Sequence, residues 1–368
     1  MKSTGLLTIV MGALSASAAF CQAPPAAQKS GPGVQAPQDP RQPELLKTCK
    51  VPPPAGRGGG QAKGGGAAKG GQAKGPAPAA GPQAVTIMGI AGVIAPGQQW
   101  KEVWQVDGNN ADGIVATKDG GLLIAQNDNS NVVKLDKDGK VSIAYTGLNT
   151  AGSVAMNSKG ALFVVNRGMN ESIEQIAPQR KPLVSKNTNG DPLDCLGGTL
   201  NDLTADSKGG VYFTMGGVFH ADSKGVVTKY GENINGNGIV LSPDEKHLYV
   251  TNGATVAAFD VQKDGSLTNQ REFAKLTAGG GDGSTIDSQG RIYVTTNGGV
   301  EVIGPDGKNL GVIPTPRGVI TCAFGGKDKK TLFILARGAK DANGEEVANA
   351  AQVWTIQMIA QGYKGRAK

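Results

Sequence analysis

The sequence contains few of the residues on which several enzyme classes depend. Its 368 residues include two histidines, four cysteines and 5% aromatic residues. Residues 86–368 contain no Gly-x-Ser-x-Gly, Cys-x-x-Cys or His-Glu-x-x-His motif, which removes support for serine-hydrolase and zinc-peptidase mechanisms. The sequence contains a repeat, described below, in which one position of each copy points to a common centre. His220 and His247 lie outside these positions, so we expect structural roles for them.

The chain has no long apolar run beyond its N-terminus. Residues 5–19 are apolar or small, Lys2 supplies a positive charge, and Cys21-Gln22-Ala23 offers a small-x-small cleavage site, so residues 1–23 are typical of a secretory signal peptide. Phe20 argues against a lipoprotein site at Cys21, because a small residue normally precedes that cysteine. No later run approaches the roughly 18 apolar residues of a membrane span. We expect an exported protein, periplasmic or extracellular, without a transmembrane segment.

Residues 24–85 have few large apolar side chains and consist mainly of Pro, Gly, Ala, Gln and Lys, which predicts a flexible tether. Residues 1–85 hold nine Lys or Arg and two Asp or Glu, so they carry the whole net charge of +7. A basic tail can bind nucleic acid, anionic lipid or cell-wall polymer. The lysines here are diluted by glycine and have no aromatic residues among them, so we favour a spacer and expect no nucleic-acid partner.

Three cysteines remain if the signal peptide is cleaved after Ala23. Cys322 lies in the apolar run GVITCAFGG and is expected to be a buried thiol. That leaves Cys49 and Cys195 as candidates for a disulfide between the tether and the following domain, which an oxidising compartment would permit.

From residue 100 onward one unit recurs six times. Each copy has an apolar strand, a polar turn of the Asp/Ser-x-x-Gly type and a second strand rich in Leu, Tyr, Phe and Val, with turns near residues 120, 160, 209, 245, 290 and 329. The spacing is close to the roughly 40 to 50 residues of a propeller blade. This predicts an all-β, six-bladed β-propeller over residues 86–368, in which the strands KEVWQV and QVWTIQ share a blade and close the ring.

Oxygen-bearing side chains precede the first strand in four of the six repeats. In a propeller this strand is the innermost one, so residues just before it point into the central channel and converge. Two aspartates and two asparagines suit a hard cation, and we expect one divalent ion, Ca²⁺ first, with Mg²⁺ or Zn²⁺ as alternatives. Asn-Gly and Asp-Gly pairs also form turns, but four at one repeat phase favour a metal site. The six positions are Asp112, Gly152, Asn201, Asn237, Asp282 and Thr321.

The repeat lacks the GH…WD signature of WD40 blades and instead resembles the SMP-30/gluconolactonase/LRE-like family over roughly residues 105–340. The motifs that carry the resemblance are Asn201-Asp202, Asn237-Gly238-Ile239 with Ser242-Pro243-Asp244, Asp282-Gly283 with Asp287-x-x-Gly290, and the run Cys322-Ala323-Phe324-Gly325-Gly326 with Thr331-Leu332.

The resemblance implies a metal-dependent hydrolase that opens a sugar lactone or a similar cyclic ester. The cation would be bound by Asp112, Asn201, Asn237 and Asp282, would polarise the ester carbonyl and would lower the pKa of a bound water. Asp282 would be the general base. The sequence departs from the family at Asp112, where relatives usually have Glu, and at Thr199, where lactonases often have Arg.

Loops that join the second and third strands are expected to open on the same face and to bind substrate. Two alternatives remain: a phosphotriesterase-like or other esterase using the same site, and a non-catalytic secreted propeller in which structural Ca²⁺ supports binding of a carbohydrate or protein partner. A monomer is the default. The candidate substrate-binding residues are Asn127, Arg167, Thr199, Met215, Asn252, Asn297 and Arg337.

Overall fold

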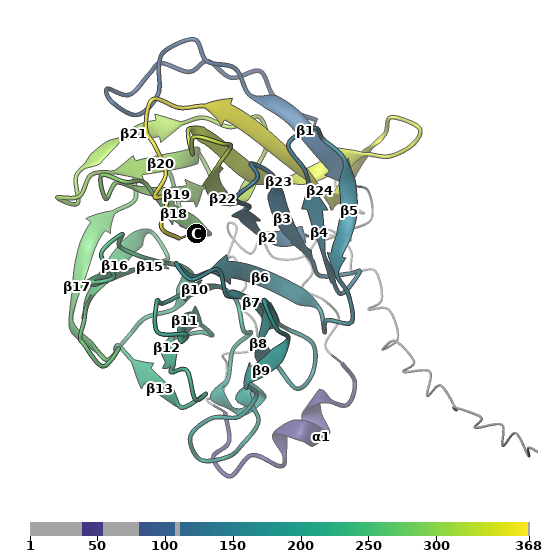
Figure 1. The fold of residues 1–368 in the computed structure, drawn as a ribbon, viewed down its shortest axis with the longest axis vertical. Coiled ribbons are helices and arrows are strands. Elements are labelled where there is room, and N and C mark those ends of the chain that lie inside the picture. Colours follow the sequence, from purple (N-terminus) through teal and green to yellow (C-terminus); the bar gives the residue numbers. More distant parts are fainter. Residues whose placement is uncertain (1–38, 54–80, 107–110, 367–368) are drawn as a thin grey trace, which may run out of the picture.

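The computed structural model describes residues 39–53, 81–106 and 111–366, in which six four-stranded antiparallel sheets form a ring (Figure 1). The predicted all-β, six-bladed propeller is therefore confirmed. The predicted signal peptide, residues 1–23, lies outside the described residues.

Five blades each use four consecutive strands that run outward from the centre of the ring. The inner strands of neighbouring blades contact one another and surround the central channel. The strands are β2 (Ala111–Ala116), β3 (Leu122–Gln126), β4 (Asn131–Leu135) and β5 (Val141–Tyr145); β6 (Ala151–Met156), β7 (Leu162–Asn166), β8 (Ser172–Ala177) and β9 (Lys181–Val184); β10 (Leu203–Ala205), β11 (Val211–Thr214), β12 (Val218–Ala221) and β13 (Val227–Tyr230); β14 (Gly236–Leu241), β15 (His247–Asn252), β16 (Thr255–Val261) and β17 (Leu267–Lys275); β18 (Ser284–Ile286), β19 (Ile292–Thr296), β20 (Gly299–Ile303) and β21 (Asn309–Ile313).

The sixth blade joins the two ends of the domain. Its strands β22 (Val319–Gly325), β23 (Thr331–Lys340) and β24 (Glu346–Gln357) are followed outward by β1 (Lys101–Val106). The pairing of β1 with β24 confirms the predicted closure by KEVWQV and QVWTIQ, and it leaves no open sheet edge between the first and last blades.

Apolar side chains fill the spaces between the blades. Six buried clusters each combine residues from two neighbouring blades, as where Phe163 of β7 packs with Phe213 of β11, and where Tyr293 of β19 packs with Cys322 of β22. The thiol of Cys322 is fully buried, as predicted. This packing fixes the spacing of the inner strands and with it the positions of the residues that begin them.

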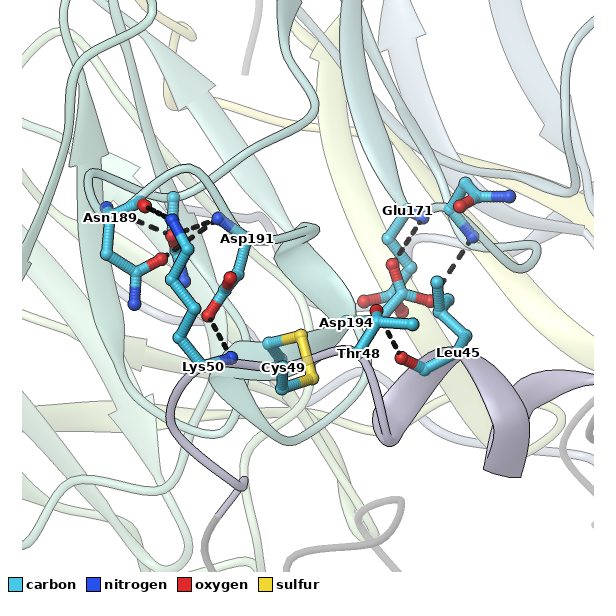
Figure 2. Close-up of a disulfide and its surroundings, with 11 residues drawn as sticks. Leu45, Thr48, Cys49, Lys50, Glu171, Asn189, Asp191 and Asp194 are labelled. Atoms are coloured by element: carbon cyan, nitrogen blue, oxygen red, sulfur yellow. Dashed lines mark hydrogen bonds between the residues drawn. A yellow bond between two sulfur atoms is a disulfide. The ribbon is translucent and has the colours of Figure 1, made fainter.

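Residues 39–53, within the predicted tether, contribute local structure to the edge of the ring. Helix α1 (Gln42–Leu46) begins with Pro43 in its first turn, where the missing backbone N–H costs no hydrogen bond. Cys49 then forms a disulfide with Cys195 in the short helix η1 (Leu193–Leu196), which confirms the candidate pair (Figure 2). Beside it, the backbone N–H of Lys50 donates to the Asp191 carboxylate at 2.9 Å (Figure 2).

The C-terminal segment crosses the ring beneath the turns that follow the inner strands. The Gly362 N–H donates to Lys329 O in the sixth blade, and Ser288 N–H of the fifth blade donates to Gln361 O. Arg366 then reaches the fourth blade, donating to Leu241 O at 2.6 Å, and Figure 1 shows this yellow segment running toward the ring centre. Within the described ranges, no helix is long and apolar enough to cross a membrane.

Candidate functional site

The four predicted ligands share one pocket at the end of the channel where the inner strands begin. Asp112 and Asn237 lie in β2 and β14, whereas Asn201 and Asp282 come two residues before β10 and β18. The repeat phase therefore places these side chains as predicted. The pocket is lined by Asp112, Gly113, Ser153, Arg167, Asn201, Asp202, Asn237, Asp282, Gly283, Ile320 and Thr321.

The glycines that follow three of the ligands allow the inner strands to approach closely. A Cβ on Gly113 would overlap the backbone of Ser153, one on Gly238 would overlap Asp282 O, and one on Gly283 would overlap Thr321. None of these three has a positive φ, so they are not turn glycines. The glycines of these Asp-Gly and Asn-Gly pairs thus allow neighbouring inner strands to lie close together around the channel.

Threonines near the ends of three second strands tie each blade to the next at the level of the pocket. Their hydroxyls donate to main-chain oxygens: Thr214 to Asn237 O at 2.5 Å, Thr251 to Asp282 O at 3.0 Å and Thr295 to Ile320 O at 2.8 Å. All three are buried. Two of the four ligands are thereby held through their own carbonyls. Sequence reasoning missed these residues, although YFT, YVT and YVTT mark them at the same repeat phase.

Asp202 is a third carboxylate in the pocket. It belongs to the Asn201-Asp202 motif, but the sequence predicted no role for it. It is buried, and its Oδ1 accepts hydrogen bonds from the Ser153 hydroxyl at 2.5 Å and from the Leu203 N–H at 2.9 Å. Its Oδ2 accepts the Ile239 N–H at 3.1 Å. Asp202 therefore links the second, third and fourth blades directly beneath the predicted ligands.

Arg167, a candidate substrate-binding residue, lines the pocket. It follows β7, and its guanidinium donates to the Asp112 carboxylate and to Asn201 Oδ1, the latter at 2.6 Å. The amide nitrogen of Asn201 donates to Asn237 Oδ1 at 2.6 Å. Three of the four ligand side chains are thus joined in one hydrogen-bonded chain, in the order Asp112, Arg167, Asn201 and Asn237.

Asp282 has the electrostatic character of a proton acceptor near neutral pH. Burial and the nearby Asp112 carboxylate raise its pKa to about 7, against the opposing effect of Arg337. Arg337 Nη2 lies 3.6 Å from Asp282 Oδ2, and its side chain is 58% exposed; Arg337 is not one of the residues that line the pocket.

The donor set fits a hard divalent cation by its chemistry. Two carboxylates and two amide oxygens converge, and all-oxygen ligation suits Ca²⁺ or Mg²⁺ better than softer metals. Among the described residues no group of three or more His, Cys, Asp or Glu side chains is placed to bind a metal, so a site here depends on the asparagines.

The other predicted substrate-binding residues do not line this pocket. Met215 packs in the apolar cluster between the second and third blades, and Asn127 is buried. Asn252 is partly exposed and accepts the Asn235 N–H at 3.0 Å. Thr199 is also partly exposed, whereas Asn297 is exposed.

The histidines are placed as expected for structural residues. His220 stacks on Tyr212 and lies 3.2 Å from Asp206 Oδ2, while His247 pairs with Asp260 at 3.2 Å. Neither lines the pocket.

Comparison with known proteins identifies relatives with this architecture. The family described as SMP-30/Gluconolactonase/LRE-like region matches residues 143–337. A gluconolactonase of Zymomonas mobilis is 28% identical over 293 residues, covering 66% of this chain and 78% of its own length.

Two solved structures have the same fold. A gluconolactonase from Xanthomonas campestris superimposes with a TM-score of 0.62 at 21% identity, covering 77% of this chain and 99% of the other. A calcium-binding protein, regucalcin, from Agrobacterium tumefaciens gives a TM-score of 0.53 at 18% identity, covering 69% and 93%. At these identities the likeness establishes the fold alone.

Proposed function

The chain belongs to the SMP-30/gluconolactonase/LRE-like family, and from this premise we propose that it hydrolyses a lactone at the central pocket. The observation that carries the proposal is the convergence of Asp112, Asn201, Asn237 and Asp282 in one pocket, together with the gluconolactonase relatives. The substrate would be a sugar lactone or a similar small cyclic ester.

One divalent cation would be held by these four residues, and Ca²⁺ is our first choice because all four offer oxygen and one relative of the same fold is a calcium-binding protein. When bound, the cation would polarise the ester carbonyl and activate a water.

Asp282 would accept the proton of the attacking water. A carboxylate that lies beside the cation can both hold the ion and accept a proton from a bound water, which is the role we propose for it. The amides of Asn201 and Asn237 do not ionise. Their role would be to position the other groups through the Asn201 to Asn237 hydrogen bond.

Arg337 would orient the substrate at the mouth of the pocket. Its side chain is mostly exposed and lies beside Asp282, so its guanidinium can meet a hydroxyl, a carbonyl or the carboxylate formed on ring opening.

The test is a hydrolysis screen of lactones, organophosphates and simple esters, run on the full chain with Ca²⁺, Mg²⁺, Zn²⁺ or chelator. We expect acid release from lactones that chelator abolishes. Asp282→Asn should lose at least 100-fold in kcat while keeping the wild-type melting temperature within a few degrees.

Asp260→Asn is the matched control, because the Asp260 side chain is 32% exposed against 30% for Asp282 and pairs with Arg271 away from the pocket. It should keep wild-type kcat. Full activity in Asp282→Asn would refute the assigned base, and turnover of organophosphates alone would favour the esterase alternative.

We also propose that the protein is exported to the periplasm or the exterior and acts as a monomer. The signal-like residues 1–23 and the Cys49–Cys195 disulfide support export, because structural disulfides persist in oxidising compartments. Cell fractionation of the full chain tests the location, and sedimentation of the purified protein tests the oligomeric state.

A further inference from the structure

Arg167 is held in the pocket by contacts that amount to a binding site for a guanidinium. Nε donates to Leu200 O at 2.9 Å, and Nη2 donates to both Asn201 O and Asn201 Oδ1 at 2.6 Å. Nη1 pairs with the Asp112 carboxylate. The Arg167 side chain is only 13% exposed, so these contacts are largely shielded from water.

The second blade leaves the space that Arg167 fills. Gly152 occupies the repeat position that carries Asp112, Asn201, Asn237 or Asp282 in other blades, and a Cβ there would overlap Arg167 Nε. A blade that offers no ligand side chain of its own therefore contributes a cation instead, from the end of its second strand.

We propose that Arg167 is a built-in cation of the central site that competes with a divalent ion for Asp112 and Asn201. The proposal rests on the metal site of the proposed function. The Asp112 carboxylate and Asn201 Oδ1 are two of the four expected ligands, and the guanidinium engages both. Two cations sharing these oxygens in a shielded pocket would repel each other strongly, so Arg167 must release both ligands before a divalent ion can use them.

This competition predicts opposite effects on the metal-free and metal-bound protein. Without metal, Arg167 neutralises Asp112, which would otherwise face the Asp282 and Asp202 carboxylates lining the same pocket. With metal, the same guanidinium opposes binding. Removing its charge should therefore weaken the metal-free protein and strengthen metal binding.

The experiment is a calorimetric titration of chelator-treated full chain with CaCl₂, combined with melting curves in chelator and in saturating Ca²⁺. For Arg167→Gln we expect a Ca²⁺ dissociation constant at least tenfold lower than wild type and a lower melting temperature in chelator. Arg167→Lys, which keeps the charge but cannot donate to several acceptors in one plane, should fall between the two. It also serves if the glutamine variant does not fold.

Arg337→Gln is the matched control, because it removes the same charge from an exposed side chain that lies 3.6 Å from Asp282 but does not line the pocket. It should change the dissociation constant less than threefold. Equal effects of the two substitutions would mean that Arg167 acts only through its charge, and this would overturn the proposal. The proposal would also be overturned by unchanged or weaker Ca²⁺ binding in Arg167→Gln, or by the absence of Ca²⁺ binding in both wild type and Arg167→Gln.

The outcomes separate this inference from the proposed function. Tighter Ca²⁺ binding in Arg167→Gln with no lactone turnover in any protein would refute the lactonase alone. Metal-dependent lactone turnover with the same Ca²⁺ affinity in wild type and Arg167→Gln would refute the competition alone.

Discussion

Glu171 is a carboxyl group buried beside the central site, with 4% of its surface exposed. Its Oε1 accepts the Leu200 N–H at 3.0 Å, while Oε2 has no hydrogen-bond partner among the described residues. Burial raises the pKa of Glu171 to about 8, and nearby Asp194 adds to the effect. The folded protein therefore holds this group neutral at pH values where an unfolded chain would release the proton.

The sign of the resulting pH dependence follows from this raised pKa. Between about pH 5 and pH 8 the folded state binds a proton that the unfolded state lacks, so Glu171 makes the free energy of unfolding fall as pH rises, by up to about 1.4 kcal/mol per pH unit. Glu171→Gln should flatten this slope and be more stable than wild type at pH 8, as measured by urea unfolding at pH 5 to 9.

Glu174→Gln is the control for this prediction. Glu174 lies in the same blade, but its carboxylate accepts hydrogen bonds from Arg180 and Asn166 at 2.8 Å. This variant should keep the wild-type slope. A slope that persists in Glu171→Gln would mean that another group causes it.

Some residues of the site could be placed from the sequence, whereas others could be placed only from the structure. The four ligand positions repeat at one phase of a countable unit, so Asp112 and Asn237 could be placed without a structure. Arg167 could not, because its position in the pocket depends on the reach of a long side chain and on the missing Cβ of Gly152. Met215, a candidate substrate-binding residue, lies away from the pocket because the short loop after β11 turns it into the apolar cluster.

At the scale of elements, the loop from β9 to β10 connects the disulfide to the site. Asp194 follows the start of η1 and accepts the N–H groups of Asn170 and Glu171 at 3.2 and 3.0 Å. Glu171 in turn accepts the Leu200 N–H next to Asn201. The Cys49–Cys195 bond thus anchors a loop whose other end carries a ligand and two acceptors for Arg167.

Loss of the disulfide should therefore destabilise the protein measurably. The bond closes a loop of 146 residues in sequence, and restricting an unfolded chain of that length contributes between about 2 and 5 kcal/mol. We expect the free energy of unfolding of the variant Cys49→Ser/Cys195→Ser, measured by urea unfolding, to be lower than that of wild type by this amount. Wild type in reductant should match the variant, and reductant should leave the variant unchanged; a wild-type protein insensitive to reductant would contradict the prediction.

At the scale of the whole molecule, the number of blades and the closure by β1 and β24 followed from repeat spacing and strand pattern. The path of the C-terminal segment did not. Residues 358–366 have no periodic apolar pattern, and their position depends on the burial of Met358 and Ala360 in the cluster between the fifth and sixth blades, on backbone hydrogen bonds to turns in these blades and on one arginine. That arginine, Arg366, is buried and links the end of the chain to the fourth blade.

Arg366 should stabilise the ring as a unit because it ties to the fourth blade a C-terminal segment that is hydrogen-bonded to the fifth and sixth blades. Its guanidinium donates to Leu241 O and Ser242 O at 2.6 and 3.1 Å and lies 3.4 Å from Glu245 Oε1. Arg366→Met keeps the apolar volume but leaves these acceptors without their donor, so we expect the free energy of unfolding to fall by about 3 kcal/mol in one cooperative urea transition.

Lys364→Met makes the same substitution at an exposed position two residues earlier and should unfold like wild type. Equal stability of the two variants would mean that the C-terminal segment only lies across the turns. A separate early transition in Arg366→Met would mean that the fourth blade unfolds independently of the ring. A single shifted transition is expected because neighbouring blades share one apolar cluster at each interface, so loosening one blade weakens the packing of the next.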